Sequence, residues 1–192
     1  MEFYHVDRDL SLQNVKTIEL QKVVDPEVFP DFKDGISKHG VRYLTYDFLQ
    51  PDYFASHAWE WALEYIRKIH FPKMPSRFQM FFAHNNFNDA VQWAKDHSAN
   101  SLVGIAKIKS DRYFSFDSSW LLSRNIRNLL PAIKTTSFAT FCRNCMHYWN
   151  QDVSEQPDIE YLLPLPCRIE EYWEFPLEIL ELQSSEKLDN QR

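Results

Sequence analysis

The chain has 192 residues, a net charge of −6 and 44% hydrophobic residues, with 15 Phe, 9 Tyr and 6 Trp among them. This composition suits a globular domain with a sizeable core and excludes a disordered chain. The three glycines form no G-x-G-x-x-G or Walker loop, which excludes Rossmann and P-loop nucleotide sites. We find neither an apolar run near the roughly 18 residues of a membrane span nor a basic signal-peptide region, and the cysteine count is odd. We therefore expect a cytoplasmic protein without a membrane partner.

The chain is expected to begin with a strand over residues 2–7. Its alternation places Phe3 and His5 on one face and Tyr4 and Val6 on the other. The rest of the first half is expected to hold an extended piece, a short helix, the longest helix and an aromatic strand, over residues 16–24, 27–32, 51–69 and 77–83.

The longest helix carries apolar residues at helical spacing, and we expect these to face the core. They are Phe54, Ala58, Trp61, Ala62, Tyr65 and Ile69. By the same pattern His57 is expected at the surface or near a helix end. The next helix, 88–97, can be capped by Asn86 or Asn88.

The second half is expected to hold a hairpin, two helices and three closing extended pieces. The hairpin strands are 102–108 and 112–116, the helices 120–130 and 138–149, and the extended pieces 159–163, 167–175 and 177–182. Helices alternate with strands in an order typical of an α+β domain. We expect one domain over residues 1–183 and a frayed polar tail over 184–192.

Charge is unevenly distributed along the sequence. Residues 1–100 carry 11 basic and 14 acidic residues, residues 101–150 carry 7 and 2, and residues 151–192 carry 3 and 11. The middle segment therefore has a balance of +5, which is suitable for a basic face toward an anionic partner. The alternative is an ordinary solvated helical surface.

Most familiar catalytic or metal-binding patterns are missing or weak. Cys142, Cys145, His147 and Cys167 have the residue types of a zinc site, but a single C-x-x-C inside an expected helix is a weak signal, and we expect no metal. The G-x-S-x-G elbow of many serine hydrolases is missing as well. The acids at 170, 171 and 174 could suggest the carboxylate pair of a glycosidase, but adjacent strand residues point to opposite faces, so Glu170 and Glu171 cannot share a cleft. We interpret these acids as charges on an edge strand.

One carboxylate stands apart from these patterns. Glu160 lies near the start of the strand 159–163, just before Leu162 and Leu163. It is either a solvated residue of a strand edge or a catalytic group that points into a cleft. His5, in the middle of the first strand, poses the same choice between a structural and a functional role.

Four stretches in order along the chain help to decide. They are Tyr4-His5-Val6, Pro75–Ala83 followed by Asp89-Ala90, Tyr148-Trp149, and Glu160–Pro166. Together they resemble small bacterial ADP-ribosyltransferase-like toxins of toxin–antitoxin and phage-defence systems. In that layout three strands of a split β-sheet each present one motif to NAD. The chain departs from the commoner Tyr-Trp-x-Gly pattern, since Asn150-Gln151 follows Trp149.

The resemblance implies an ADP-ribosyltransferase-like split β-sheet core with helical insertions and NAD⁺ as co-substrate. Glu160 would stabilise the oxocarbenium-like state and His5 would hold the adenosine-side ribose. The strand of Tyr4 and Val6 would pair with the nicotinamide amide. Phe78 or Phe82 is expected to stack on the nicotinamide ring, and Arg77 or Arg8 to bind the pyrophosphate. Ser76 and Gln79, the polar residues of the middle motif, are the remaining expected NAD contacts.

The expected activity is mono-ADP-ribosylation with release of nicotinamide. The resemblance points to nucleic acid as acceptor, with RNA favoured over DNA, and to a neutralising antitoxin protein as partner. The alternatives are an ADP-ribosyltransferase that acts on a protein side chain, a non-catalytic binding module of the same fold, and a ribonuclease that needs neither metal nor NAD.

Overall fold

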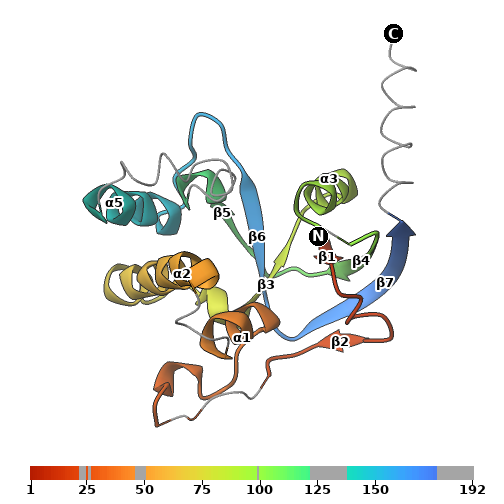
Figure 1. Ribbon diagram of the computed structural model, residues 1–192, viewed down its shortest axis with the longest axis horizontal. Helices are drawn as coiled ribbons and strands as arrows, with labels where there is room; N and C mark the ends of the chain where they lie inside the picture. The colour runs from red at the N-terminus through yellow and green to blue at the C-terminus, as the bar shows by residue number, and fades with distance from the viewer. Residues whose placement is uncertain (22–24, 26, 46–50, 99, 122–137, 177–192) are drawn as a thin grey trace. The chain divides into compact units, whose positions relative to one another are not determined.

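A computed structural model describes the chain apart from residues 22–24, 26, 46–50, 99, 122–137 and 177–192 (Figure 1). The contacts divide the chain into two compact units. Unit 1 combines Met1–Glu19, Phe82–Tyr113 and Pro166–Arg192, and unit 2 combines Leu20–Phe81 and Phe114–Leu165. The two units are therefore interleaved in sequence. Helices and antiparallel strands occur together, as expected for an α+β protein.

Unit 1 contains an antiparallel sheet with the strand order β1-β4-β7-β2. The strands are β1 (Glu2–Asp7), β2 (Thr17–Ile18), β4 (Leu102–Lys109) and β7 (Cys167–Pro176). Helix α3 (Phe87–His97) packs on this sheet through small residues, since Ala90 and Ala94 form one cluster with Val6 and Val103. Asn86 caps the helix, because its side chain accepts a hydrogen bond from the Asp89 backbone at 2.8 Å.

Unit 2 combines helices with a second sheet of strand order β3-β6-β5. Its strands are β3 (Met80–Ala83), of which only the first two residues belong to unit 2, β5 (Phe114–Asp117) and β6 (Ile159–Pro164). The described helices of unit 2 are α1 (Lys38–Thr45), α2 (Pro51–His70) and α5 (Phe138–Trp149). The described residues of unit 2 also form three short 3-10 turns, η1 (Pro30–Phe32) before α1, η2 (Arg77–Gln79) before β3 and η3 (Ser118–Leu121) after β5.

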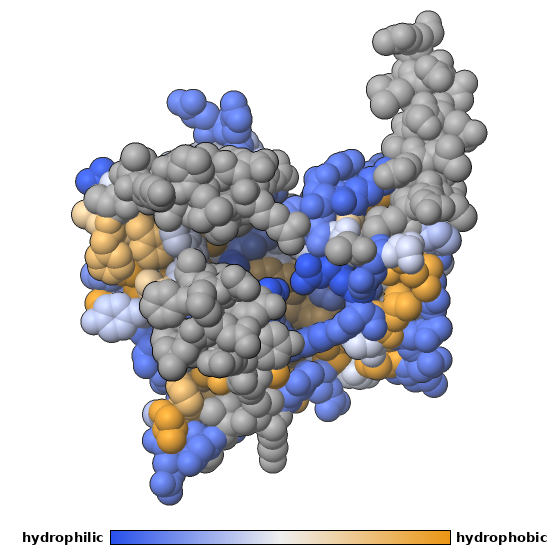
Figure 2. Space-filling model, in the orientation of Figure 1, coloured by the Kyte–Doolittle hydropathy of each residue, from blue (hydrophilic) through white to orange (hydrophobic). Residues whose placement is uncertain are grey.

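Aromatic rings form the core of unit 2. Phe78 is completely buried in a cluster with Phe32 and Ile36. Phe116 stacks on Tyr148, with ring centroids 4.7 Å apart, and Trp149 donates from Nε1 to the Leu63 carbonyl at 3.0 Å. Hydrophobic residues also reach the surface of the molecule (Figure 2). Among the exposed large side chains of unit 2 are Tyr65 of α2 and Phe138 of α5.

Two local predictions were wrong because sequence alternation hid a turn and a change of partner. Residues 77–79 form the turn η2, so only Met80–Ala83 of the expected strand is extended. The expected hairpin does not form, since β4 pairs with β1 and β7, whereas β5 pairs with β6. Phe114 and Phe116 therefore lie in the sheet of unit 2, whereas the aliphatic strand β4 lies in the sheet of unit 1.

The expected buried face of α2 was also wrong in part. Tyr65 and Ile69 are 64% and 52% exposed, whereas His57 and Leu63 are fully buried. The buried side of the helix is polar as well as apolar, because Arg67 binds Glu64 through two hydrogen bonds of 2.9 and 2.7 Å. Because Glu64 and Arg67 neutralise each other, both can be buried, although the apolar pattern of the helix alone would place charged residues in solvent.

The acids of β7 lie beyond its short pairing with β2. The two residues of β2 pair with Arg168 and Cys167, so Glu170, Glu171 and Glu174 have β4 as strand neighbour on one side, in keeping with the expected edge charges. The register between β4 and β7 shifts next to Lys107. There Lys107 binds Glu171 and Glu2 at 3.1 and 2.9 Å. The expected tail 184–192, the extended piece 177–182 and most of the helix 120–130 lie outside the described residues, and the single domain over 1–183 stays a prediction. Among the described residues, no helix is both long and apolar enough to span a membrane.

Candidate functional site

Glu160 is held in place by its strand. It lies in β6 opposite Phe116 of β5, and two fully buried leucines, Leu162 and Leu163, follow it. These leucines fix the strand in the core of unit 2 while the Glu160 side chain stays 19% exposed. The carboxylate is therefore firmly supported and still partly accessible to solvent.

Arg77 binds Glu160 from the turn η2. Ser76 caps this turn by accepting a hydrogen bond from the Phe78 backbone at 3.2 Å. The turn directs the Arg77 side chain into unit 2, where it is 7% exposed and Nη1 donates to Glu160 Oε1. The short turn thus explains how Arg77 and Phe78 both point inward, which strict strand alternation does not allow.

Arg77 has a second carboxylate partner, Glu60 of α2. Nε and Nη2 of Arg77 donate to Oε2 and Oε1 of Glu60, each at 3.1 Å. This is the two-pronged geometry in which a guanidinium binds a carboxylate most specifically. His39 of α1 lies close to the same carboxylate, with Nε2 at 3.8 Å from Glu60 Oε1.

Tyr148, which is fully buried near the end of α5, completes the network. Its hydroxyl donates to Glu160 Oε1 and accepts from Arg77 Nη1 at 2.5 Å. Burial raises the pKa of Tyr148 well above its usual value, and the nearby Glu160 charge adds to this effect despite the opposing charge of Arg77. The phenol therefore stays protonated and keeps its hydrogen bond to Glu160.

The charges of this network stabilise one another. Burial alone would favour neutral Glu60, but the charge of Arg77 and the neighbouring His39 outweigh it and lower the pKa of Glu60 below its usual range. Burial likewise disfavours charged Arg77, yet Glu160 and Glu60 raise its pKa well above normal. Both Glu60 and Arg77 are therefore charged at neutral pH.

His5 is oriented by a contact within unit 1. Its Nδ1 lies 2.7 Å from the Phe82 carbonyl. A carbonyl only accepts, so Nδ1 carries the hydrogen, and in the neutral ring Nε2 is the acceptor. The ring of a partly buried strand histidine is thus fixed in orientation and tautomer.

The other residues expected around His5 have defined partners. The Tyr4 backbone pairs in both directions with His84 at 2.8 Å, so this amide and carbonyl are already used on that edge of β1. Val6 is buried in the cluster beneath α3. A pairing of this strand with nicotinamide stays a prediction, and the backbone of Tyr4 on the His84 edge is not available for it.

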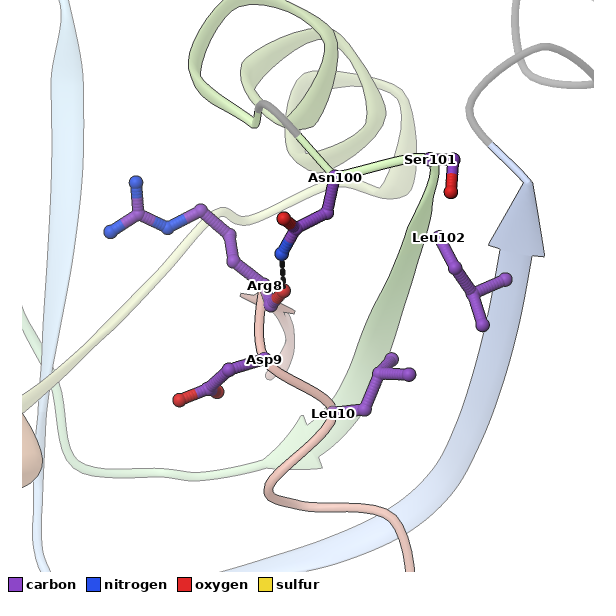
Figure 3. Close-up of a pocket in the computed structure, with 6 residues that line it drawn as sticks. All are labelled: Arg8, Asp9, Leu10, Asn100, Ser101 and Leu102. Carbon is purple, nitrogen blue, oxygen red and sulfur yellow. Dashed lines mark hydrogen bonds between the residues drawn. The ribbon is translucent and has the colours of Figure 1, made fainter.

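Arg8 lines an open, polar pocket of about 470 Å³ just after β1, shown in Figure 3. The other lining residues are Asp9, Leu10, Asn100, Ser101 and Leu102. The Arg8 side chain extends away from Leu10 and Leu102, and its guanidinium lies 5.5 Å from the centre of the Trp93 ring. Asn100 donates to the Arg8 carbonyl at 2.5 Å and fixes the backbone beneath it.

The expected site residues thus fall into two groups. Ser76, Arg77, Phe78, Gln79 and Glu160 belong to unit 2, and Tyr4, His5, Val6, Arg8 and Phe82 belong to unit 1. The structure brings Arg77 and Glu160 into direct contact, whereas Phe78 packs in the core and Gln79 donates to the Gly35 carbonyl at 3.1 Å. A cleft shared by His5 and Glu160 stays a prediction.

Two members of the Glu160 network were missed from the sequence. Tyr148 was noted as part of a motif but had no assigned role, and Glu60 was not noted at all. A signal for Glu60 exists, because Glu60, Glu64 and Arg67 recur at i, i+4 and i+7 and so share one face of an aromatic-rich helix.

The cysteines contribute to no metal centre in the described parts of the chain, where no three His, Cys, Asp or Glu side chains are arranged to hold an ion. Burial raises the pKa of the Cys145 thiol to about 12 and that of Cys167 to about 11. Both thiols are therefore protonated and chemically inert at neutral pH.

The fold and this network define an α+β protein with a carboxylate supported by arginine and tyrosine. The chain belongs to the family described as "Protein of unknown function (DUF2441)", whose model matches residues 3–175. No curated protein matches the chain significantly.

Proposed function

We propose that this protein is an NAD-dependent mono-ADP-ribosyltransferase. The observation that carries the proposal is the state of Glu160, which is partly exposed yet bound by Arg77 and Tyr148. A solvated residue of a strand edge has no need of a buried arginine and a buried tyrosine. Such fixed support is typical of a carboxylate that must act in one orientation.

The reaction uses Glu160 for electrostatic stabilisation. The bond between ribose C1′ and the nicotinamide nitrogen breaks, and its electron pair leaves with nicotinamide. Positive charge develops on C1′ and the ring oxygen, where a nearby carboxylate lowers its energy. The acceptor then gives an electron pair to C1′ and loses a proton to solvent.

The other proposed contacts follow the placement of each side chain. His5, with its hydrogen on Nδ1, would accept a hydrogen bond from an adenosine-side ribose hydroxyl at Nε2. Because Arg77 binds Glu60 and Glu160, we assign the pyrophosphate to Arg8 and the orientation of Glu160 to Arg77. Because Phe78 is fully buried, we assign the stacking on nicotinamide to Phe82.

We propose nucleic acid as acceptor, with RNA favoured, in a cytoplasmic toxin or defence role with a neutralising antitoxin. The support is the balance of +5 over residues 101–150. Within the described residues, Lys107, Lys109 and Arg112 belong to unit 1 and Arg143 belongs to unit 2. Lys107 is bound to two acids, so the remaining basic residues would carry the contact.

The first experiment measures nicotinamide release from NAD for the wild type and for Glu160→Gln. We expect the variant to lose about a hundredfold or more in rate, as for removal of one electrostatic group from an active site. Glu155→Gln, an exposed residue outside the network, is the matched control and should keep the wild-type rate. A wild type that never cleaves NAD with RNA, DNA or cell lysate, or an unchanged Glu160→Gln rate, would contradict the proposal.

The acceptor is tested with NAD labelled in its adenosine part. Label is expected in RNA and should be lost in Glu160→Gln. Label found only in protein would instead support a protein side chain as acceptor. Cleavage of RNA without NAD would identify a ribonuclease and overturn the transferase.

A further inference from the structure

We propose that Glu60 is a positioning residue for this reaction, which acts through Arg77 and preserves the negative charge that Glu160 presents to the substrate. The inference rests on the proposed function. It concerns a residue that acts on Glu160 through Arg77 and that lies outside the four stretches on which the resemblance rests.

The geometry shows an arginine shared between two carboxylates. Glu60 takes Nε and Nη2 of Arg77, which leaves Nη1 directed to Glu160 and Tyr148. The bidentate contact fixes the plane of the guanidinium, so the direction of Nη1 is fixed as well. Glu60 thereby determines where Arg77 contacts the proposed catalytic carboxylate.

Besides orienting Arg77, Glu60 affects the net charge around Glu160. If Arg77 paired with Glu160 alone, the pair would be neutral and would attract a developing cation weakly. Two carboxylates share one guanidinium, so Glu60 takes up part of the Arg77 charge that would otherwise neutralise Glu160, and His39 lies 3.8 Å from Glu60 Oε1 as a further neighbour of that carboxylate. Since Glu60 is 11% exposed, its charge is poorly screened by solvent and acts strongly on its neighbours.

A purely structural role does not explain this arrangement well. The Glu64–Arg67 pair, on the same helix, has one acid and one base and is as buried. The Arg77 cluster instead places two carboxylates around one guanidinium, with His39 next to Glu60, and removing this second acid from water costs stability. Locally unfavourable charge of this kind is found mostly where function requires it.

The experiment compares Glu60→Gln with Glu64→Gln in the steady-state release of nicotinamide. Both variants lose the charge of a buried acid that binds an arginine, so both are expected to lower the midpoint of thermal unfolding. Only Glu60→Gln is expected to lower kcat, by about tenfold, with KM for NAD within about threefold of wild type. Glu60→Asp keeps the charge and should retain kcat within a few-fold.

Each outcome decides between the possibilities. A wild-type kcat in folded Glu60→Gln, or an equal loss of kcat in Glu64→Gln, would overturn the role of Glu60 and leave the transferase standing. A wild type without NAD cleavage would overturn the transferase itself. If Glu60→Gln does not fold, Glu60→Asp carries the test, and a loss of more than about tenfold in its kcat would overturn the importance of charge.

Discussion

Gly40 shows how closely α1 approaches the turn that carries Arg77. A Cβ atom at Gly40 would collide with the backbone carbonyl oxygen of Phe78. The Ser37 backbone and hydroxyl both donate to this same carbonyl, at 2.7 and 3.0 Å, so it has little freedom to move. The missing side chain at Gly40 is therefore a condition for the position of η2.

We expect Gly40→Ala to destabilise the protein by about 1–3 kcal/mol, the usual cost of overpacking. Alanine gains about 1 kcal/mol in helix propensity over glycine, but a clash with fixed backbone outweighs that gain. Chemical denaturation of both proteins measures the difference. Equal or higher stability of the variant would show that α1 can shift away from Phe78.

For single residues, the sequence identified Glu160 as the acid of the site but not all of the side chains that bind it. Glu160 and Arg77 were named because they stand beside apolar strand residues within recognisable motifs. Tyr148 was named in a motif without a role and Glu60 was not named, since their importance arises only when α2 and α5 bring them to Arg77. The helical spacing of Glu60, Glu64 and Arg67 indicates a shared face, but not that Arg77 is the partner of Glu60.

Among the elements, the end of β5 holds the loop before β6 in place. Asp117 is 2% exposed and accepts hydrogen bonds from the backbones of Ser119, Ser154 and Asp158 at 3.0, 2.8 and 2.9 Å. Burial opposes its charge, but the Ser119 side chain and these backbone donors outweigh burial and lower the pKa of Asp117 below its usual range. The ionised carboxylate thus fixes the loop that leads to Glu160.

We expect Asp117→Asn to lose about 2 kcal/mol at pH 7, because hydrogen bonds to a charged acceptor become weaker. The pKa of Asp117 is lowered on folding, so its contribution is complete above the unfolded value of about 3.9 and is lost as the pH falls below it. The stability gap between wild type and variant should therefore narrow from pH 5 to pH 3. Denaturation curves over this range measure it, and a gap independent of pH would refute the role of the charge.

Sequence patterns predicted most elements correctly but paired some of them wrongly. α3, α5, β1, β4, β6 and β7 all lie close to their expected ranges. The expected 102–116 hairpin failed, because a short connection after β4 was interpreted as a turn between partners. In fact β5 finds β6 some 40 residues later in the chain, and local sequence carries no information about such a choice.

For the whole molecule, the interleaving of the two units is the main feature. The chain passes from one unit to the other after Glu19, Phe81, Tyr113 and Leu165. Residues of unit 2 separate consecutive segments of unit 1, so the segments that form unit 1 are connected through unit 2. Independent folding of either unit would carry the entropic cost of closing long loops.

We therefore expect the two units to unfold together. Cys145 is buried in unit 2 and Cys167 in unit 1, and each reports on its own unit through exposure to a thiol reagent. In pulses of reagent at increasing denaturant, both should become labelled at the same concentration, whereas half-buried Cys142 should react earlier. Labelling of Cys167 well before Cys145 would show that unit 1 opens alone.

The segment from Arg77 to Phe82, in which the chain passes from unit 2 to unit 1, is constrained in its number of residues. Arg77, at one end of this segment, contacts Glu160, and the carbonyl of Phe82, at the other end, contacts His5. An insertion or deletion here would fall within η2 or β3, the elements that carry these two contacts. We therefore expect this short segment, unlike an ordinary surface loop, to tolerate little change in its number of residues.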